Sequence, residues 1–304
     1  MFRNVRFYRV SSPWPETEQE LSDLLTKCKF VPVGPLAEKR SGWEAPAGDE
    51  LMCRRVGGAD LLRMRTQSRL LPVAAINEAL ETRVAEYRER MQENPSRRQL
   101  RRLKEETRDE LLPKALTKSE RIDGFFMLSD RLLGIDAGSV SKAERFIDLL
   151  RASLEGFEFT PLAFRKPVGE LMTAIFLGDN VEGFGAASEC RMQDLSEEKA
   201  VATWRNTNLA DSTIRQHVID GMKLTHLGVH YNDLLGCVIA EDGAISKIAF
   251  PEADAADVTD DEDPLALLDA EFVLLTGTLR ELVADLKKQL DGYATTQPDQ
   301  AHAA

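Results

Sequence analysis

The chain of 304 residues is 43% hydrophobic and 30% charged, and its formal net charge is −12. It is long enough for a sizeable core in one large or two modest domains, and no apolar run approaches the roughly 18 residues that a membrane span requires. Its scattered cysteines lack C-x-x-C spacing, which predicts a reduced, cytoplasmic setting without a disulfide framework.

The first part of the chain, 1–72, predicts an N-terminal α+β region. Residues 2–10 alternate apolar and charged side chains, as a half-buried strand does, and 16–29 have the spacing of an amphipathic helix. Phe30–Val33 is expected to form a short strand. Leu61–Leu70 is expected to form a longer strand with arginines at alternate positions.

Residues 73–118 predict a charged helical hairpin. Apolar residues three and four apart indicate a helix over 73–93, which Pro95 ends. Ser96 with Gln99 three residues later is a capping-box pattern, so a second helix is expected to follow at once. A short break between two helices is typical of an antiparallel pair.

Positive charge is concentrated at the start of this second helix, where five of the eight residues 97–104 are basic. Helical spacing places four cations in one narrow stripe, namely Arg97, Arg101, Lys104 and Arg108. Arg98 and Arg102 flank the stripe beside Glu105 and Asp109, which can neutralise them. Two interpretations remain open: a solvated surface helix, and a face that contacts phosphates.

Residues 119–250 predict a central α+β region. Its expected elements are a β-hairpin at 125–135, an amphipathic helix at 140–155, and short strands over 157–250 that one helix at about 211–222 interrupts.

The last part, 251–304, is expected to hold an acidic loop at 252–263, a helix over 271–291 and a polar tail. Strands and helices alternate without a steady βαβ rhythm. The predicted class is therefore α+β, with mixed short-strand sheets, amphipathic helices and the charged helical hairpin.

Patterns for catalysis or metal binding are weak. His226 and His230 lie in a strand-like segment, where residues i and i+4 are about 13 Å apart, so the sequence favours partly buried strand histidines over a zinc site. Residues 183–188 lack the third glycine of a phosphate-binding loop and indicate a turn. Residues 260–263 lack the ligand pattern of a calcium loop. We expect a binding protein and no enzyme, with no metal and no cofactor.

Several motifs occur in one order along most of the chain: Phe2–Val5, Gly42-Trp43-x-x-Pro46-x-Gly48, Leu111–Leu116, Lys142–Glu144 and Asp269–Gly277. Each is weak alone, but in this order they resemble the RdgC family of recombination-associated proteins of proteobacteria. The resemblance implies a homodimer closed into a ring, of which this chain is half. Duplex DNA would pass through a positively charged central hole.

The resemblance further implies binding to DNA of any sequence, restraint of RecA-dependent recombination, and a place in the cytoplasm at the nucleoid, with no membrane partner. Whether single-stranded DNA also binds is left open. The resemblance and the charge pattern together make eleven cations candidate DNA contacts: Arg83, Arg90, Arg97, Arg98, Arg101, Arg102, Lys104, Arg108, Lys114, Lys118 and Arg205.

The family also places an aromatic side chain at a subunit contact in the position of Leu116, so Leu111, Leu112 and Leu116 are the candidate dimer contact. The family also has a basic stretch before the helix at 211–222, where this chain keeps only Arg205.

Two other functions are considered. One is a protein–protein module that docks the hairpin on an acidic partner such as RecA, and the other is a metal-dependent nuclease.

Overall fold

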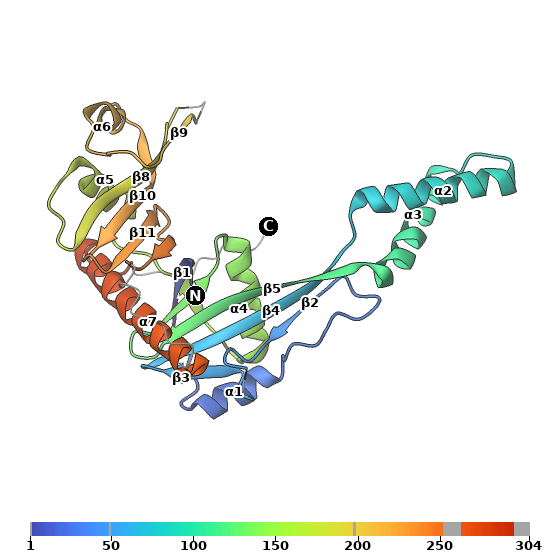
Figure 1. Ribbon diagram of the computed structural model, residues 1–304, viewed down its shortest axis with the longest axis horizontal. Coiled ribbons are helices and arrows are strands. Elements are labelled where there is room, and N and C mark those ends of the chain that lie inside the picture. Colours follow the sequence, from blue (N-terminus) through green and yellow to red (C-terminus); the bar gives the residue numbers. More distant parts are fainter. Residues whose placement is uncertain (1, 49, 197–198, 252–262, 295–304) are drawn as a thin grey trace.

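The computed structural model describes residues 2–48, 50–196, 199–251 and 263–294 (Figure 1). Its helices are α1 (Glu18–Thr26), α2 (Val73–Met91), α3 (Arg97–Leu111), a 3₁₀ turn η1 (Leu112–Lys114), α4 (Val140–Ser153), α5 (Val168–Leu177), α6 (Ser212–Ile219) and α7 (Pro264–Gln289). Its strands are β1 (Asn4–Val10), β2 (Lys39–Trp43), β3 (Cys53–Val56), β4 (Ala59–Leu70), β5 (Leu116–Met127), β6 (Leu132–Asp136), β7 (Phe159–Pro161), β8 (Phe184–Gln193), β9 (Val201–Trp204), β10 (Lys223–Tyr231), β11 (Leu235–Ala240) and β12 (Ile245–Ala249).

These strands form one antiparallel sheet across the described residues. The order is β2-β4-β5-β6-β1-β12-β11-β10-β8-β9, with β3 beside β4 and β7 beside β1. The pairing of β1 with β12, at Asn4↔Ser246 and Val5↔Ile245, joins the N-terminal strands to the C-terminal ones. The predicted α+β class is confirmed, with the sheet continuous through both regions.

Two apolar cores lie on opposite faces of the N-terminal half of the sheet, because side chains alternate along a strand. Leu61 and Phe125 face the core that α5 and α7 help to build. Their neighbours Leu62 and Phe126 face the core covered by α1 and α4. This double cover fixes the inner ends of β4 and β5 in the body.

From the body, β4 and β5 continue as a ribbon that carries α2 and α3 at its far end, with β2 paired along the other edge of β4 (Figure 1). The pairing runs from Ala59↔Met127 in the body to Leu70↔Leu116 at the helices. We call residues 63–123 the arm. The predicted pair of helices is confirmed, as is the capping box, because Ser96 and Gln99 each accept the other's backbone N–H.

Two short segments differ from their predicted form. Phe30–Val33 is not a strand, and the side chain of Gln67, rather than a neighbouring strand, accepts the Val33 N–H (2.9 Å). Residues 183–188 are not simply a turn: Gly183 has a positive φ (81°), but β8 starts at the next residue and pairs with β10. In both cases a partner distant in the sequence decides the form.

Two helices also differ from prediction. The sequence predicted short strands where α5 forms. This segment is so apolar that the spacing of its residues does not mark one helical face. The structure shows which residues are buried: Val168, Leu171, Met172, Ile175 and Phe176. α7 begins at Pro264, before the predicted start at 271, and Asp263 caps it by accepting the Leu265 N–H (3.0 Å). Residues 252–262 of the predicted acidic loop and 295–304 of the predicted tail lie outside the described residues.

One buried ion pair in the body has a large predicted effect on stability. The fully buried Asp60 carboxylate accepts hydrogen bonds from Arg55 (2.6 and 2.8 Å) and from Trp14 Nε1 (2.7 Å). Asp60→Ala leaves the indole N–H unpaired and the Arg55 guanidinium with only the carbonyls of Pro15 and Glu16 in place of its carboxylate, so we expect the free energy of unfolding in urea to fall by about 3–5 kcal/mol. Asp242→Ala, which breaks the more exposed pair with Arg6, should cost less than about 1 kcal/mol. Equal decreases in the free energy of unfolding of the two variants would show that burial does not make the Asp60–Arg55 pair more important than an exposed one.

Candidate nucleic-acid interface

The two helices of the arm hold each other through a small interior. Tyr87 and Thr107 are buried between them, and the Gln99 side chain donates a hydrogen bond to the Tyr87 hydroxyl (2.6 Å). Arg83 is half-buried and forms an ion pair with Glu110. Arg83, a predicted DNA contact, therefore also joins α2 to α3.

The remaining predicted cations of the arm are all exposed: Arg90, Arg97, Arg98, Arg101, Arg102, Lys104, Arg108, Lys114 and Lys118. Among the described residues, five of them have no ion-pair partner: Arg90, Arg97, Arg98, Lys104 and Lys118. We call Arg97, Arg98, Arg101, Arg102 and Lys104 the basic end of α3. Acidic residues recur along α2 and in the second half of α3, so positive charge on the arm is greatest at this end.

The predicted neutralisation of the flanking arginines is partly wrong. Arg102 pairs with Glu106 (2.8 Å), not with Glu105. Glu105 instead lies 3.5 Å from Arg101, a member of the stripe, because residues four apart are neighbours on a helix. Arg98 has no carboxylate partner in the described part of the chain. Exposed pairs of this kind contribute about 0.2–1 kcal/mol, so a phosphate can replace either carboxylate.

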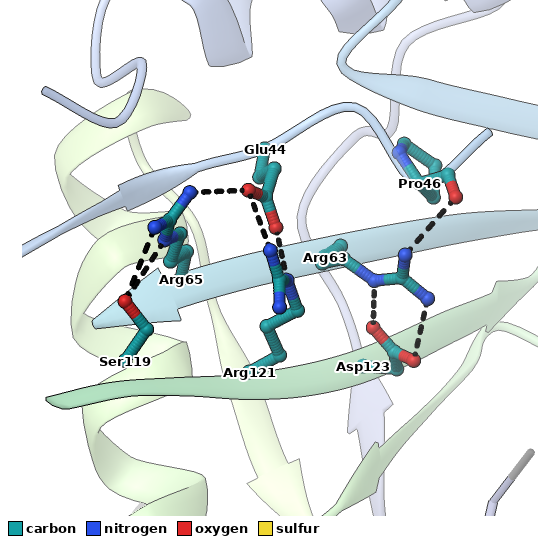
Figure 2. Close-up of polar contacts among 7 residues, drawn as sticks. All are labelled: Glu44, Pro46, Arg63, Arg65, Ser119, Arg121 and Asp123. Atoms are coloured by element: carbon teal, nitrogen blue, oxygen red, sulfur yellow. Dashed lines mark hydrogen bonds and ion pairs between the residues drawn. The ribbon is translucent and has the colours of Figure 1, made fainter. Parts of the chain in front are cut away.

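The arginines of the ribbon are engaged with carboxylates, as Figure 2 shows. Glu44 accepts from Arg65 (2.9 Å) and from Arg121 (3.2 Å), and Asp123 accepts two hydrogen bonds from Arg63 (2.7 and 3.0 Å). The hydrogen bond from Arg121, then that from Arg65, holds the pKa of Glu44 below its usual value. These contacts brace the ribbon, and the sequence did not reveal them because Glu44 lies outside both strands.

The Glu44 contacts predict a pH-dependent contribution to stability. Glu44→Gln should lower the free energy of unfolding by about 1 kcal/mol at pH 7, since it leaves Arg65 and Arg121 without their carboxylate. The folded-state pKa of Glu44 is lowered, so its contribution is present above the unfolded pKa of about 4.3 and is lost as the pH falls through the folded value. Urea unfolding from pH 7 to pH 3 should show the two proteins converging. Asp148→Asn, at an exposed pair of 3.9 Å, is the control and should have almost no effect at any pH.

A second set of contacts fixes the helices to the ribbon. Arg69, near the outer end of β4, donates to four backbone carbonyls (3.0–3.4 Å), those of Gly34, Leu112, Pro113 and Ala115. Arg108 of α3 forms an ion pair with Glu38, in the segment before β2. The basic end of α3 is thus held in a defined position relative to the sheet.

The predicted dimer-contact residues have different environments. Leu112 is buried within the chain (6% exposed), and Leu111 is half-buried. Leu116 is 77% exposed and lies opposite Leu70, itself 48% exposed, at the last pair of the β4–β5 ladder. Val73 is also exposed (64%). The free apolar surface at this place consists of Leu70, Val73 and Leu116.

Arg205 lies far from the arm. It follows β9, whereas α2 and α3 lie at the opposite end of the molecule (Figure 1). Arg205 lines a hollow of about 310 Å³ on the C-terminal strands, together with Arg191, His226 and Lys247. His226 and His230 both lie on β10, as predicted; His226 is partly buried, whereas His230 is exposed, so the predicted partial burial is wrong for His230. The structure therefore separates the predicted cations into two regions, the arm and this hollow.

Fold and site together define an α+β protein that projects a cation-bearing helical hairpin on a ribbon arm. A family model described as "Putative exonuclease, RdgC" matches residues 1–293. The chain belongs to the RdgC family. It is 30% identical to the recombination-associated protein RdgC of Cupriavidus necator and 29% identical to that of Cupriavidus pinatubonensis, each over 96% of this chain and 98% of the relative. The relative of the same name from Sodalis glossinidius is 28% identical, over 97% and 99% of the two chains.

Two other kinds of feature, a metal-binding cluster and a membrane-spanning helix, are absent from the described residues. No group of three or more His, Cys, Asp or Glu side chains has an arrangement that could hold a metal ion. No helix combines the length and apolar character that crossing a membrane requires.

Proposed function

We propose that this protein binds double-stranded DNA of any sequence as a homodimer closed into a ring, and that it restrains RecA-dependent recombination. The observation that carries the proposal is the basic end of α3, five exposed cations at the far end of an arm in a protein of net charge −12. The printed names of the relatives support a role in recombination. In this proposal the protein acts in the cytoplasm, at the nucleoid.

Electrostatics explains how an acidic protein can bind DNA in this way. Charges are screened beyond a Debye length of about 10 Å, so a phosphate near the basic end of α3 interacts chiefly with local cations. Long Arg and Lys side chains that contact phosphates position a duplex without reading its bases. The predicted contacts Lys114, Lys118 and Arg90 extend this surface over the rest of the arm.

The free apolar surface on the arm supports the proposed subunit contact. Leu70, Val73 and Leu116 are exposed in the single chain, and burial against a second copy would remove them from water. A contact at the arm of each subunit would close one side of a ring. Arg205 lies at the other end of each subunit and contributes a separate part of the proposed DNA path.

The description of the family model favours one alternative, a nuclease. Our proposal predicts that plasmid and linear duplex DNA remain intact after incubation with the protein and magnesium. Degradation that a chelator stops would favour the nuclease instead.

The proposal is tested by measuring duplex binding as a function of salt. If the dimer neutralises roughly six to ten phosphates, the logarithm of affinity should fall with the logarithm of salt concentration by about 0.9 per phosphate. Unrelated duplexes should give the same line. A gel shift or anisotropy titration with no duplex binding at low salt would contradict the proposal and favour a module that docks on an acidic protein.

A further inference from the structure

A hollow of about 790 Å³ lies where β1 ends, between β7, the β5–β6 turn and Tyr293, in the segment that follows α7. This volume is in the range of small-molecule sites, roughly 300–1,000 Å³. Three guanidinium groups line it, those of Arg9, Arg131 and Arg151. The hollow is at the inner end of β5, and the arm's helices are at its outer end, roughly 36 Å away at strand spacing.

Aromatic rings and backbone carbonyls hold these arginines, and the one ion pair that they form among the described residues is the long, exposed contact of Arg151 with Asp148 (3.9 Å). The Arg9 guanidinium lies 5.0 Å from the Tyr293 ring centroid, and Arg151 lies 4.6 Å from that of Phe159. Arg131 donates to the carbonyls of Val10 (3.3 Å) and Ser12. The side chains are positioned, yet their charge is left for a ligand.

The acids nearby offset this charge only in part. Asp130 is ion-paired with Arg280 (2.8 Å). Glu158 keeps its negative charge beside the Ser11 hydroxyl (3.4 Å), so three guanidinium groups face one carboxylate that has no ion-pair partner among the described residues. The nearest carboxylate to Arg151 is that of Asp148, at 3.9 Å. A fourth cation, Lys287, lies 4.8 Å from the Tyr293 ring at the edge of the hollow.

We propose that this hollow is a nucleotide site, which takes a free nucleotide or one unit of a single-stranded nucleic acid. Guanidinium groups match the geometry of phosphate oxygens, so Arg9 and Arg151 would bind the phosphate. Arg151 already lies over the Phe159 ring, on which Phe157 also stacks (5.7 Å), so the surface left for a base is the open face of the Arg151 guanidinium. The site is separate from the proposed duplex contact on the arm.

Calorimetric titration of the full chain with dAMP, inorganic phosphate and the oligonucleotide (dA)12 tests the site. Arg9→Ala and Arg151→Ala should each weaken dAMP binding at least tenfold, whereas Lys27→Ala, the same change of charge at an exposed position outside the hollow, should not. Arg9→Lys and Arg151→Lys keep the charge but remove the planar fork, and should also weaken it. Melting followed by circular dichroism identifies any variant that has lost its fold.

The ligands distinguish the two sources. Tighter binding of (dA)12 than of dAMP, weakened by the same variants, assigns the site to a single strand, and equal binding assigns it to the free nucleotide. No dAMP binding at millimolar concentration, equal binding of phosphate, or binding that the arginine variants leave unchanged would each overturn the proposal. Duplex binding measured in parallel should keep its salt dependence in every variant. A result that contradicts the nucleotide site can therefore be told apart from one that contradicts duplex binding by the arm.

Discussion

Replacing Arg97, Arg101 and Lys104 together by alanine is expected to make duplex affinity much less dependent on salt. If each of these side chains contacts one phosphate, the slope of log affinity against log salt should become less negative by about 2.7 per protomer. Binding to all sequences should weaken alike, because phosphates carry no sequence information. An anisotropy titration at several salt concentrations measures both effects.

The matched control removes three exposed cations from the body, through Lys27→Ala, Lys166→Ala and Lys288→Ala. The net charge changes equally, so the control separates loss of total charge from loss of local contacts. Its slope should stay near that of the unmodified protein. If both triple variants changed the slope by the same amount, α3 would have no special role.

The arm was readable from sequence because its signals are local. Pro95 ends one helix, and the capping box of Ser96 and Gln99 starts the next, within a few residues. The basic end of α3 was visible for the same reason, since neighbours in the sequence are neighbours on a helix. Even in this helix, the pairing of Glu105 with Arg101 depends on side-chain rotamers that the sequence does not specify.

The ribbon could not be predicted in the same way, because its key contacts join distant segments. Arg65 pairs with Glu44 across 21 positions, and Arg121 does so across 77. The sequence showed alternate arginines on a strand but not the carboxylate that engages them. The hollow at Arg9 is a still clearer case, since β1, α4 and Tyr293, which follows α7, meet only in the folded chain.

Leu116→Asp is expected to break the proposed subunit contact. Full burial of a leucine contributes about 1.5–3 kcal/mol, and in a two-fold contact the substitution counts twice. Loss of roughly 3–6 kcal/mol raises the dissociation constant of that contact by about 10²–10⁴-fold, before the cost of burying a carboxylate. Sedimentation velocity should show dissociated subunits, or an opened dimer if a second contact remains.

Two further variants determine whether the contact depends on Leu116 itself. Leu234→Asp, at a half-exposed leucine in the turn between β10 and β11, should leave sedimentation unchanged. Leu116→Phe should preserve or strengthen the dimer, because a ring adds apolar area at a position that is 77% exposed in the single chain. If Leu116→Asp sedimented like the unmodified dimer, the subunit contact would have to lie elsewhere. Since Leu116 is the first residue of β5, the strand that supports α3, loss of this contact should also reduce duplex affinity, through separation of the two basic ends rather than loss of any cation.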